Sequence, residues 1–237
     1  MKVSYDLHIH SCLSPCADIE MTPNNIVNMS VLNGLNVIAI TDHNSCKNCK
    51  ALVEAGKKAN LLVIPGMEIC TNEDIHVICL FETVTDAENF STYVYSNMPL
   101  IPHRPDIFGE QIIMNSNDIE ISKESYLLLN ATNISVNDIL STTNKYNGTA
   151  FPAHIDKSSY SVISSLGDIP PEAGFNTIEI STKGNIEKIK SLHPIIKDKL
   201  ILINSDSHYL ENLISEKRYI EIDTLSTKSI INYINGN

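Results

Sequence analysis

The stretch VSYDLHIH, residues 3–10, decides the fold. Its first part is typical of a short buried strand, and two histidines follow at the end of that strand. Side chains two apart on a strand point to the same side, so His8 and His10 could bind one cation. LILINSDSH, residues 200–208, repeats this arrangement with Asp206 and His208. Both stretches therefore predict a strand that leads into a metal site.

Outward from this stretch, predicted strands alternate with predicted helices. Thr22 and Pro23 are typical of a helix start, and NVIAI, LLVIPG and IHVICLF predict three further strands. The alternation resumes after residue 135, where TAFPAH and NTIEIS predict two more strands. This pattern favours an α/β fold built on a parallel sheet or barrel. Residues 97–134 break the pattern and are expected to form an irregular excursion within one domain, residues 1–237.

Metal-binding residue types gather at the predicted strand ends. The histidines at or just beyond a carboxyl end are His8, His10, His43, His154 and His208. Glu68 follows the third strand, and His76 lies near the start of IHVICLF. A parallel barrel collects these strand ends on one face, where burying so many polar groups is costly unless a cation offsets the desolvation. His103 and His193 are expected to be structural or solvated residues.

The ordered motifs DLHIH, TDHN, GMEI, IHVICLF, PAHID and SDSH resemble the polymerase-and-histidinol-phosphatase (PHP) family. The resemblance runs from residue 6 to about residue 208. It implies a distorted, TIM-like barrel of seven strands, (β/α)7. It also implies up to three divalent metal ions (Zn, Mn or Fe) and the hydrolysis of phosphoesters.

The resemblance further implies a set of metal ligands, which are His8, His10, Asp18, His43, Glu68, His76, His154, Asp206 and His208. In this arrangement Glu68 bridges two cations. The first is shared with Asp206 and the two histidines of the first strand, and the second is held with His76 and His154.

The third cation would be held by His43, His208 and one side chain of the first loop. The family commonly places that ligand five residues after the second histidine, where this chain has a proline. Asp18 has the expected offset from Pro23, so a three-residue lengthening of the loop makes Asp18 the predicted ligand. Cys16 is close by and could also bind.

The implied reaction is an attack on phosphorus by metal-activated hydroxide. The residues expected to be catalytic are Glu68, His10, Asp206 and His208. Lys157 and Arg104 are candidates for binding a substrate phosphate. The ligand histidines should be neutral, so activity should fall in mild acid, and Asp6 and Asp42 are candidates to orient them.

The composition limits the partners. The net charge is −11 and only two arginines occur, which argues against long nucleic acid and favours a small phosphorylated substrate. No signal peptide or membrane-spanning stretch is evident, so we expect a cytoplasmic protein with no membrane partner. A nuclease and a non-catalytic metal-binding regulatory module are the alternatives, and an amidohydrolase is disfavoured because a glutamate takes the bridging position.

The cysteines allow a second metal site. Cys12, Cys16, Cys46 and Cys49 lie in two loops that are neighbours if consecutive strands pair, so they could bind zinc or an iron–sulfur cluster. Such short spacings discriminate poorly, and we expect free thiols instead.

Overall fold

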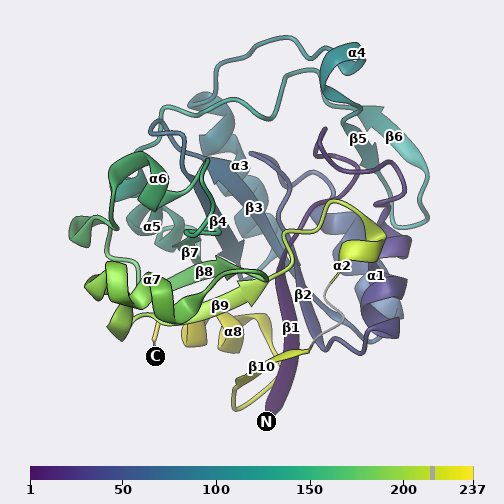
Figure 1. Cartoon of the computed structure of the whole chain (residues 1–237). Helices are drawn as coiled ribbons and strands as arrows, with labels where there is room; N and C mark the ends of the chain where they lie inside the picture. Colours follow the sequence, from purple (N-terminus) through teal and green to yellow (C-terminus); the bar gives the residue numbers. More distant parts are fainter. Residues whose placement is uncertain (214–216, 237) are drawn as a thin grey trace.

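The computed structural model describes residues 1–213 and 217–236, which form an α/β fold (Figure 1). The strands are β1 Lys2–Ile9, β2 Val37–Ile40, β3 Leu62–Cys70, β4 His76–Phe81, β5 Ile112–Met114, β6 Glu120–Lys123, β7 Gly148–Pro152, β8 Thr177–Ser181, β9 Leu200–Asn204 and β10 Arg218–Glu221. The helices are α1 Pro23–Leu32, α2 Cys49–Lys58, α3 Val84–Ser96, α4 Pro105–Phe108, α5 Val136–Asn144, α6 Val162–Leu166, α7 Ile186–Leu192 and α8 Thr227–Ile234.

Local signals place the helices as expected. The Thr22 hydroxyl accepts a hydrogen bond from the Asn25 amide, and Pro23 opens α1. Ser135 caps α5 in the same way. These side chains satisfy backbone N–H groups that have no partner within the helix, and the predicted start of α1 is confirmed.

The main sheet has six strands in the order β10-β1-β2-β3-β4-β7. Strands β1, β2 and β3 are parallel, whereas β4 is antiparallel to both β3 and β7. Residues 71–75 between β3 and β4 are too few for a parallel crossover, which needs a dozen or more. Because β4 runs the other way, its first residue, His76, pairs with Cys70 at the end of β3. The reversal brings His76 to the edge where β1–β3 end.

The complete seven-stranded barrel is not confirmed. The six-stranded sheet curls into a half-barrel, and β8 and β9 form a separate parallel pair (Figure 1). An isolated bridge between Ile9 and Ser207 connects the end of β1 to the residues after β9. On the other side, the Ile155 amide donates to the carbonyl of Glu179. Ile9 and Glu179 lie in β1 and β8, but their partners Ser207 and Ile155 lie outside the strands. No continuous ladder therefore closes the barrel among the described residues.

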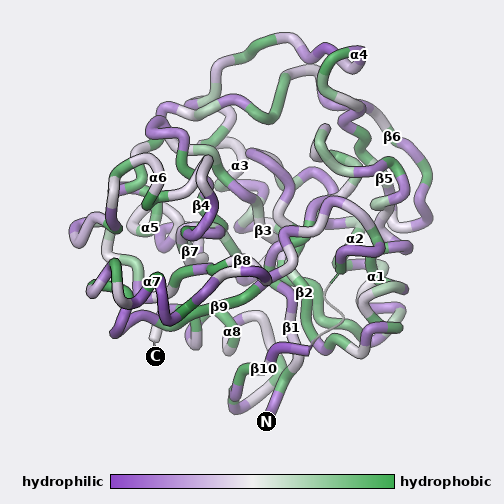
Figure 2. The backbone as a smooth tube through the Cα atoms, in the orientation of Figure 1, coloured by the Kyte–Doolittle hydropathy of each residue, from purple (hydrophilic) through white to green (hydrophobic). Residues whose placement is uncertain are grey.

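Two hydrophobic clusters support the sheet. One includes Leu7, Ala39, Ile78 and Phe151, and the larger one lies between the sheet and its covering helices. Figure 2 shows hydrophobic residues running along β2, whose four residues are all buried. Strands buried on both faces are typical of α/β folds and hold the strand ends rigidly. None of the helices in the described ranges has the length and apolar character needed to cross a bilayer. The cytoplasmic location stays a prediction.

Residues 97–134 carry a short helix, α4, and a two-stranded hairpin of β5 and β6. The buried carboxylate of Glu124 joins this excursion to the body, because it pairs with Lys47 and accepts from the Tyr95 hydroxyl. The Ile112 amide donates to the carbonyl of Cys12, which fixes β5 against the loop after β1. The excursion is thus an ordered cover for that loop. The single-domain assignment of residues 1–237 stays a prediction.

Candidate metal centre

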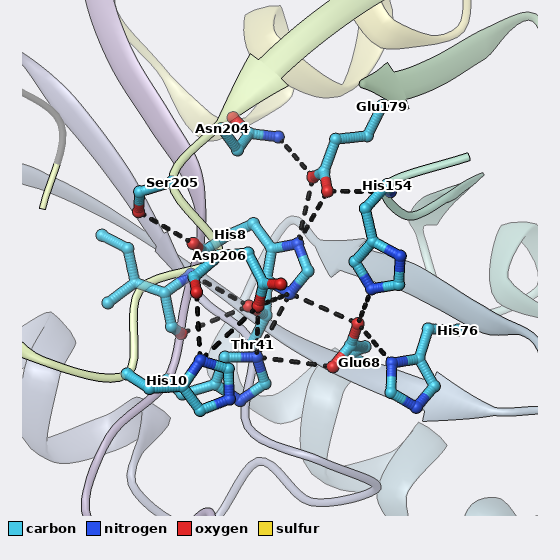
Figure 3. Close-up of polar contacts among 12 residues, drawn as sticks. His8, His10, Thr41, Glu68, His76, His154, Glu179, Asn204, Ser205 and Asp206 are labelled. Atoms are coloured by element: carbon cyan, nitrogen blue, oxygen red, sulfur yellow. Dashed lines mark hydrogen bonds and ion pairs between the residues drawn. The ribbon is translucent and has the colours of Figure 1, made fainter. Parts of the chain in front are cut away.

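The structure brings together most of the predicted metal ligands at one edge of the sheet (Figure 3). His8 lies in β1 and His10 directly after it, His43 follows β2, Glu68 lies in β3, and His76 begins β4. His154 follows β7, while Asp206 and His208 follow β9. His154 and Asp206 have positive φ angles of 27° and 52°. Such angles are uncommon for residues other than glycine and cluster at functional sites.

Glu68 lies at the middle of the cluster with only 1% of its surface exposed. Its Oε1 is 2.9 Å from His76 Nδ1 and 3.3 Å from the Nε2 atoms of His8 and His154. Its Oε2 is 3.0 Å from His43 Nδ1 and 3.4 Å from His10 Nε2. Burial raises the pKa of Glu68, but the surrounding imidazoles outweigh it and hold that pKa well below its usual value. One carboxylate therefore contacts histidines from strands β1 and β4 and from the loops after β1, β2 and β7.

The contacts of Glu68 are not hydrogen bonds. Neither carboxylate oxygen has a hydrogen-bond partner among the described residues, although both are buried. A buried carboxylate without donors is costly, and short contacts that lack hydrogen-bond geometry are expected where oxygen and nitrogen atoms face a common cation. Glu68 therefore fits a bridging metal ligand.

The contacts of His8 and His10 also fit metal ligands. The Nδ1 of His8 lies 3.0 and 3.1 Å from the two carboxylate oxygens of Glu179, so this nitrogen carries the proton. The Nδ1 of His10 lies 2.9 Å from the Ser14 hydroxyl, which donates its own proton to Asp42 and so accepts from the ring. In their neutral, metal-binding form both rings would present an Nε2 lone pair, and these two atoms are only 3.1 Å apart. A cation between them removes that conflict.

Charge in the cluster also favours cations. Burial opposes protonation of His10, but Asp206 and Glu68 outweigh it and raise its pKa to about 9. Burial likewise opposes protonation of His43, and Glu68 raises its pKa to about 9. Burial and the neighbouring charge of His10 lower the pKa of His208 to about 3. The two carboxylates therefore draw positive charge into the site, and divalent cations would supply it.

Three groups of potential ligands have their donor atoms within 4.8 Å of one another. These groups are His8, His10 and Glu68; His43, Glu68 and His76; and His10, His43 and His208. The cluster could thus hold metal ions, and histidine with carboxylate suits several transition metals. The grouping differs from the family-derived assignment. His43 stands beside Glu68 and His76 where His154 was expected, and His10 completes the third group where Asp18 was expected. Asp206 and His154 belong to none of the three groups.

Asp18 lies apart from these groups. Its Oδ1 accepts a hydrogen bond from the Glu20 amide at 2.8 Å, while its own amide donates to the carbonyl of His208 at 2.9 Å. The backbone is therefore beside the cluster, but the carboxylate caps a local turn. Cys16, in contrast, adds to the effect of Glu68 in raising the pKa of His43. The assignment of Asp18 as a ligand stays a prediction.

We expect Asp18→Ala to remove one metal ion per chain and to leave the ions at Glu68 in place, because the backbone of Asp18 contacts His208, a predicted ligand of the third ion. Elemental analysis of the purified variant tests this, with Cys16→Ser as the matched variant. Full metal content in Asp18→Ala would contradict the assignment, and loss of an ion in Cys16→Ser would transfer the role to the thiol.

The two predicted phosphate-binding residues have different positions. Lys157 lines the cavity of the cluster and forms an ion pair with Asp206. Arg104 lies in the excursion, where it is mostly exposed and pairs with Asp106. The structure does not bring Arg104 into the cavity of the cluster.

The cysteines do not form a four-thiol site among the described residues. Cys12, Cys46 and Cys49 are buried and Cys16 is exposed, and none belongs to a group of ligands able to hold a metal ion. Each of the four is a free thiol.

Sequence reasoning missed several residues that position the ligands. Glu179 in β8 holds His8 and also accepts from the His154 amide and from the Asn204 side chain. A glutamate inside the apolar strand NTIEIS was the available signal, because a buried carboxylate must have partners. Asp42 and Asp6, in contrast, were predicted to orient ligands. Asp42 contacts His10 through Ser14, whereas Asp6 accepts from the Ser205 amide and so holds the loop of Asp206.

Tyr160 was missed as well. Its ring stacks on His76 with centroids 4.7 Å apart and an interplanar angle of 19°. Its φ is 52°, in the left-handed region that bulky residues rarely adopt, and its carbonyl accepts from the His76 amide. No motif in the sequence indicated this role, which depends on the conformation of the loop after β7.

A family model described as the PHP domain matches residues 6–224, and the chain belongs to this family. A 5'-3' exoribonuclease of Haemophilus influenzae is 34% identical over 83 residues, which are 34% of this chain and 29% of the relative. The lesion-specific endonuclease PfuEndoQ from Pyrococcus furiosus has a similar fold, with a TM-score of 0.78 and 20% identity. The match covers 100% of this chain and 56% of that protein. A complex of endonuclease Q with a 27-mer duplex substrate that carries an abasic lesion matches with a TM-score of 0.68, 18% identity and coverage of 100% and 57%.

These comparisons contradict the expected partners. The sequence favoured a small phosphorylated substrate and argued against long nucleic acid, whereas the relatives named above act on RNA or DNA. The expectation was wrong because a net charge averages over the whole surface. Contacts to a phosphate backbone depend on where the positive side chains lie, and not on their total.

Proposed function

We propose that this PHP chain is a metal-dependent phosphodiesterase that hydrolyses nucleic acid. The observation that carries the proposal is the buried Glu68 carboxylate, whose two oxygens contact five imidazoles without hydrogen-bond geometry. Divalent cations bound there would activate a water molecule at neutral pH and neutralise charge on the phosphoryl oxygens. The relatives that act on nucleic acid support this choice of substrate. The matched regions cover 29% of the exoribonuclease and 56% of the endonuclease.

The side chains would divide the work as follows. Glu68, His10, Asp206 and His208 hold the reacting centre, while Lys157 neutralises a substrate phosphate next to Asp206. The buried partners behind the histidines keep the Nε2 lone pairs directed into the cavity.

Tyr160 adds a feature that fits a nucleotide better than a simple phosphoester. Its side chain lines the cavity of the cluster, and 49% of the residue is exposed. Stacking of a nucleobase on an aromatic ring contributes about 1–3 kcal/mol and tolerates any base. An exposed ring beside the scissile phosphate would therefore hold a base in place.

The test uses protein purified with Mn, Zn or Fe supplied. Single-stranded RNA and DNA oligonucleotides labelled at either end are offered beside a panel of phosphomonoesters, with and without EDTA. We expect metal-dependent cleavage of an oligonucleotide, and the choice of label separates exonuclease from endonuclease products. Glu68→Gln purified in parallel excludes a contaminating nuclease. Cleavage of phosphomonoesters alone, or of nothing, would overturn the proposal.

A further inference from the structure

A second cavity lies directly beside the metal cluster. Its volume is about 460 Å³, and it is formed by the loop after β7, α6, the loop after β8 and α7. Figure 1 shows α6 and α7 on the same side of the molecule. Lys157 lines both this cavity and the cavity of the cluster, so the two meet at this side chain.

The second cavity is positively charged in a chain of net charge −11. Lys157, Lys183 and Lys188 all line it. Lys183 and Lys188 form no ion pair with any residue in the described ranges. The carboxylate that also lines the cavity, Asp156, is already engaged, because its two oxygens accept from the amide and hydroxyl of Ser181 at 2.7 and 2.6 Å. Lys183 and Lys188 are therefore available to bind an anion.

Part of the cavity wall is apolar. Ile163, Ile189 and Leu192 line it together with the charged side chains. Its volume is in the range of small-molecule pockets, which run from about 300 to 1,000 Å³. A ligand that fits this combination has an anionic part for the lysines and a flat or apolar part for the walls. A nucleotide unit of a nucleic acid strand has both.

We propose that this cavity binds the nucleotide next to the phosphodiester that is cut, with Lys183 and Lys188 on its phosphate. The inference rests on the proposed function and names a second contact for the same substrate. Lys157 marks the boundary between the two subsites. The strand would thus run from the metal cluster across the loop after β7 to α7, and recognition would be independent of sequence, as for contacts to the phosphate backbone in general.

The test compares two double variants with equal loss of charge. Lys183→Gln with Lys188→Gln removes the proposed contacts, and Lys145→Gln with Lys228→Gln removes two exposed lysines that line neither cavity. The metal-loaded proteins are assayed on a single-stranded oligonucleotide at a series of KCl concentrations. They are also assayed on bis(p-nitrophenyl) phosphate, which has a single phosphate.

For the cavity variant we expect kcat/KM on the oligonucleotide to fall on the order of 10-fold near 0.1 M salt. The slope of log(kcat/KM) against log[salt] should become shallower by about 0.7 for each lost phosphate contact. Turnover of bis(p-nitrophenyl) phosphate should stay within about twofold of the parent, and arginine at both positions should restore the slope. The control variant should behave like the parent on both substrates.

Two results would overturn the inference and identify the cause. If the parent cleaves the oligonucleotide and the cavity variant keeps the same salt slope, the cavity binds no phosphate while the proposed function stands. If the parent does not cleave oligonucleotides at all, both the proposed function and this inference are wrong.

Discussion

Glu68→Gln is expected to lower hydrolysis at least about 10³-fold and to reduce the bound metal. The variant removes the charge that two of the potential metal-binding groups share. Loss of several kcal/mol of charge stabilisation in the transition state corresponds to about a thousandfold in rate. Elemental analysis and the oligonucleotide assay measure the two effects on one preparation.

The matched control is Glu54→Gln, which changes an exposed glutamate on α2 and should leave both quantities unchanged. Thermal unfolding in EDTA shows whether Glu68→Gln folds, and Glu68→Asp supplies a variant that keeps the charge with a shorter side chain. Parent-like turnover and metal content in Glu68→Gln would disprove the bridging role.

Glu179→Gln is expected to weaken metal binding and activity about 10- to 100-fold, although Glu179 contributes to none of the three potential ligand groups. The carboxylate fixes the proton of His8 on Nδ1 and also holds the His154 amide. A neutral amide can turn its NH₂ group toward the ring and favour the wrong tautomer, which takes the Nε2 lone pair out of the cluster.

Metal affinity separates this role from a purely structural one. The dissociation constant for Mn²⁺ or Zn²⁺ should rise in Glu179→Gln, and excess metal should restore part of the activity. Glu172→Gln, at an exposed position in the segment before β8, is the control. Unchanged affinity together with a lower melting temperature would show that Glu179 serves the fold alone.

Much of the centre could be predicted because its signals are local. The paired positions of His8 and His10 follow from the period of a strand, and the start of α1 follows from Thr22 and Pro23. The order of the motifs then indicated the family, and the family resemblance implied the set of ligands. These features depend on a few neighbouring residues, so the rest of the chain is not needed to interpret them.

Other features depend on contacts that a local pattern does not contain. Whether β4 runs parallel or antiparallel depends on the short turn before it, and this decides that His76 reaches the cluster from the start of its strand. The contact of Glu179 with His8 spans 171 residues. The side chain of Asp18 depends on a loop whose geometry the motif does not fix.

The turn between β3 and β4 also bears on how the centre assembles during folding. Glu68 and His76 are eight residues apart, whereas the contact between His8 and Glu179 closes a loop of 171 residues. With a closure cost that grows as the logarithm of loop length, the long contact costs about 3 kcal/mol more chain entropy than the short one. The hairpin half of the centre can therefore form early from nearby residues, and the half that contains Asp206 and Glu179 waits for the C-terminal strands. A cation bound by residues of both halves would form its contacts late in folding. It would then stabilise the C-terminal part against local unfolding.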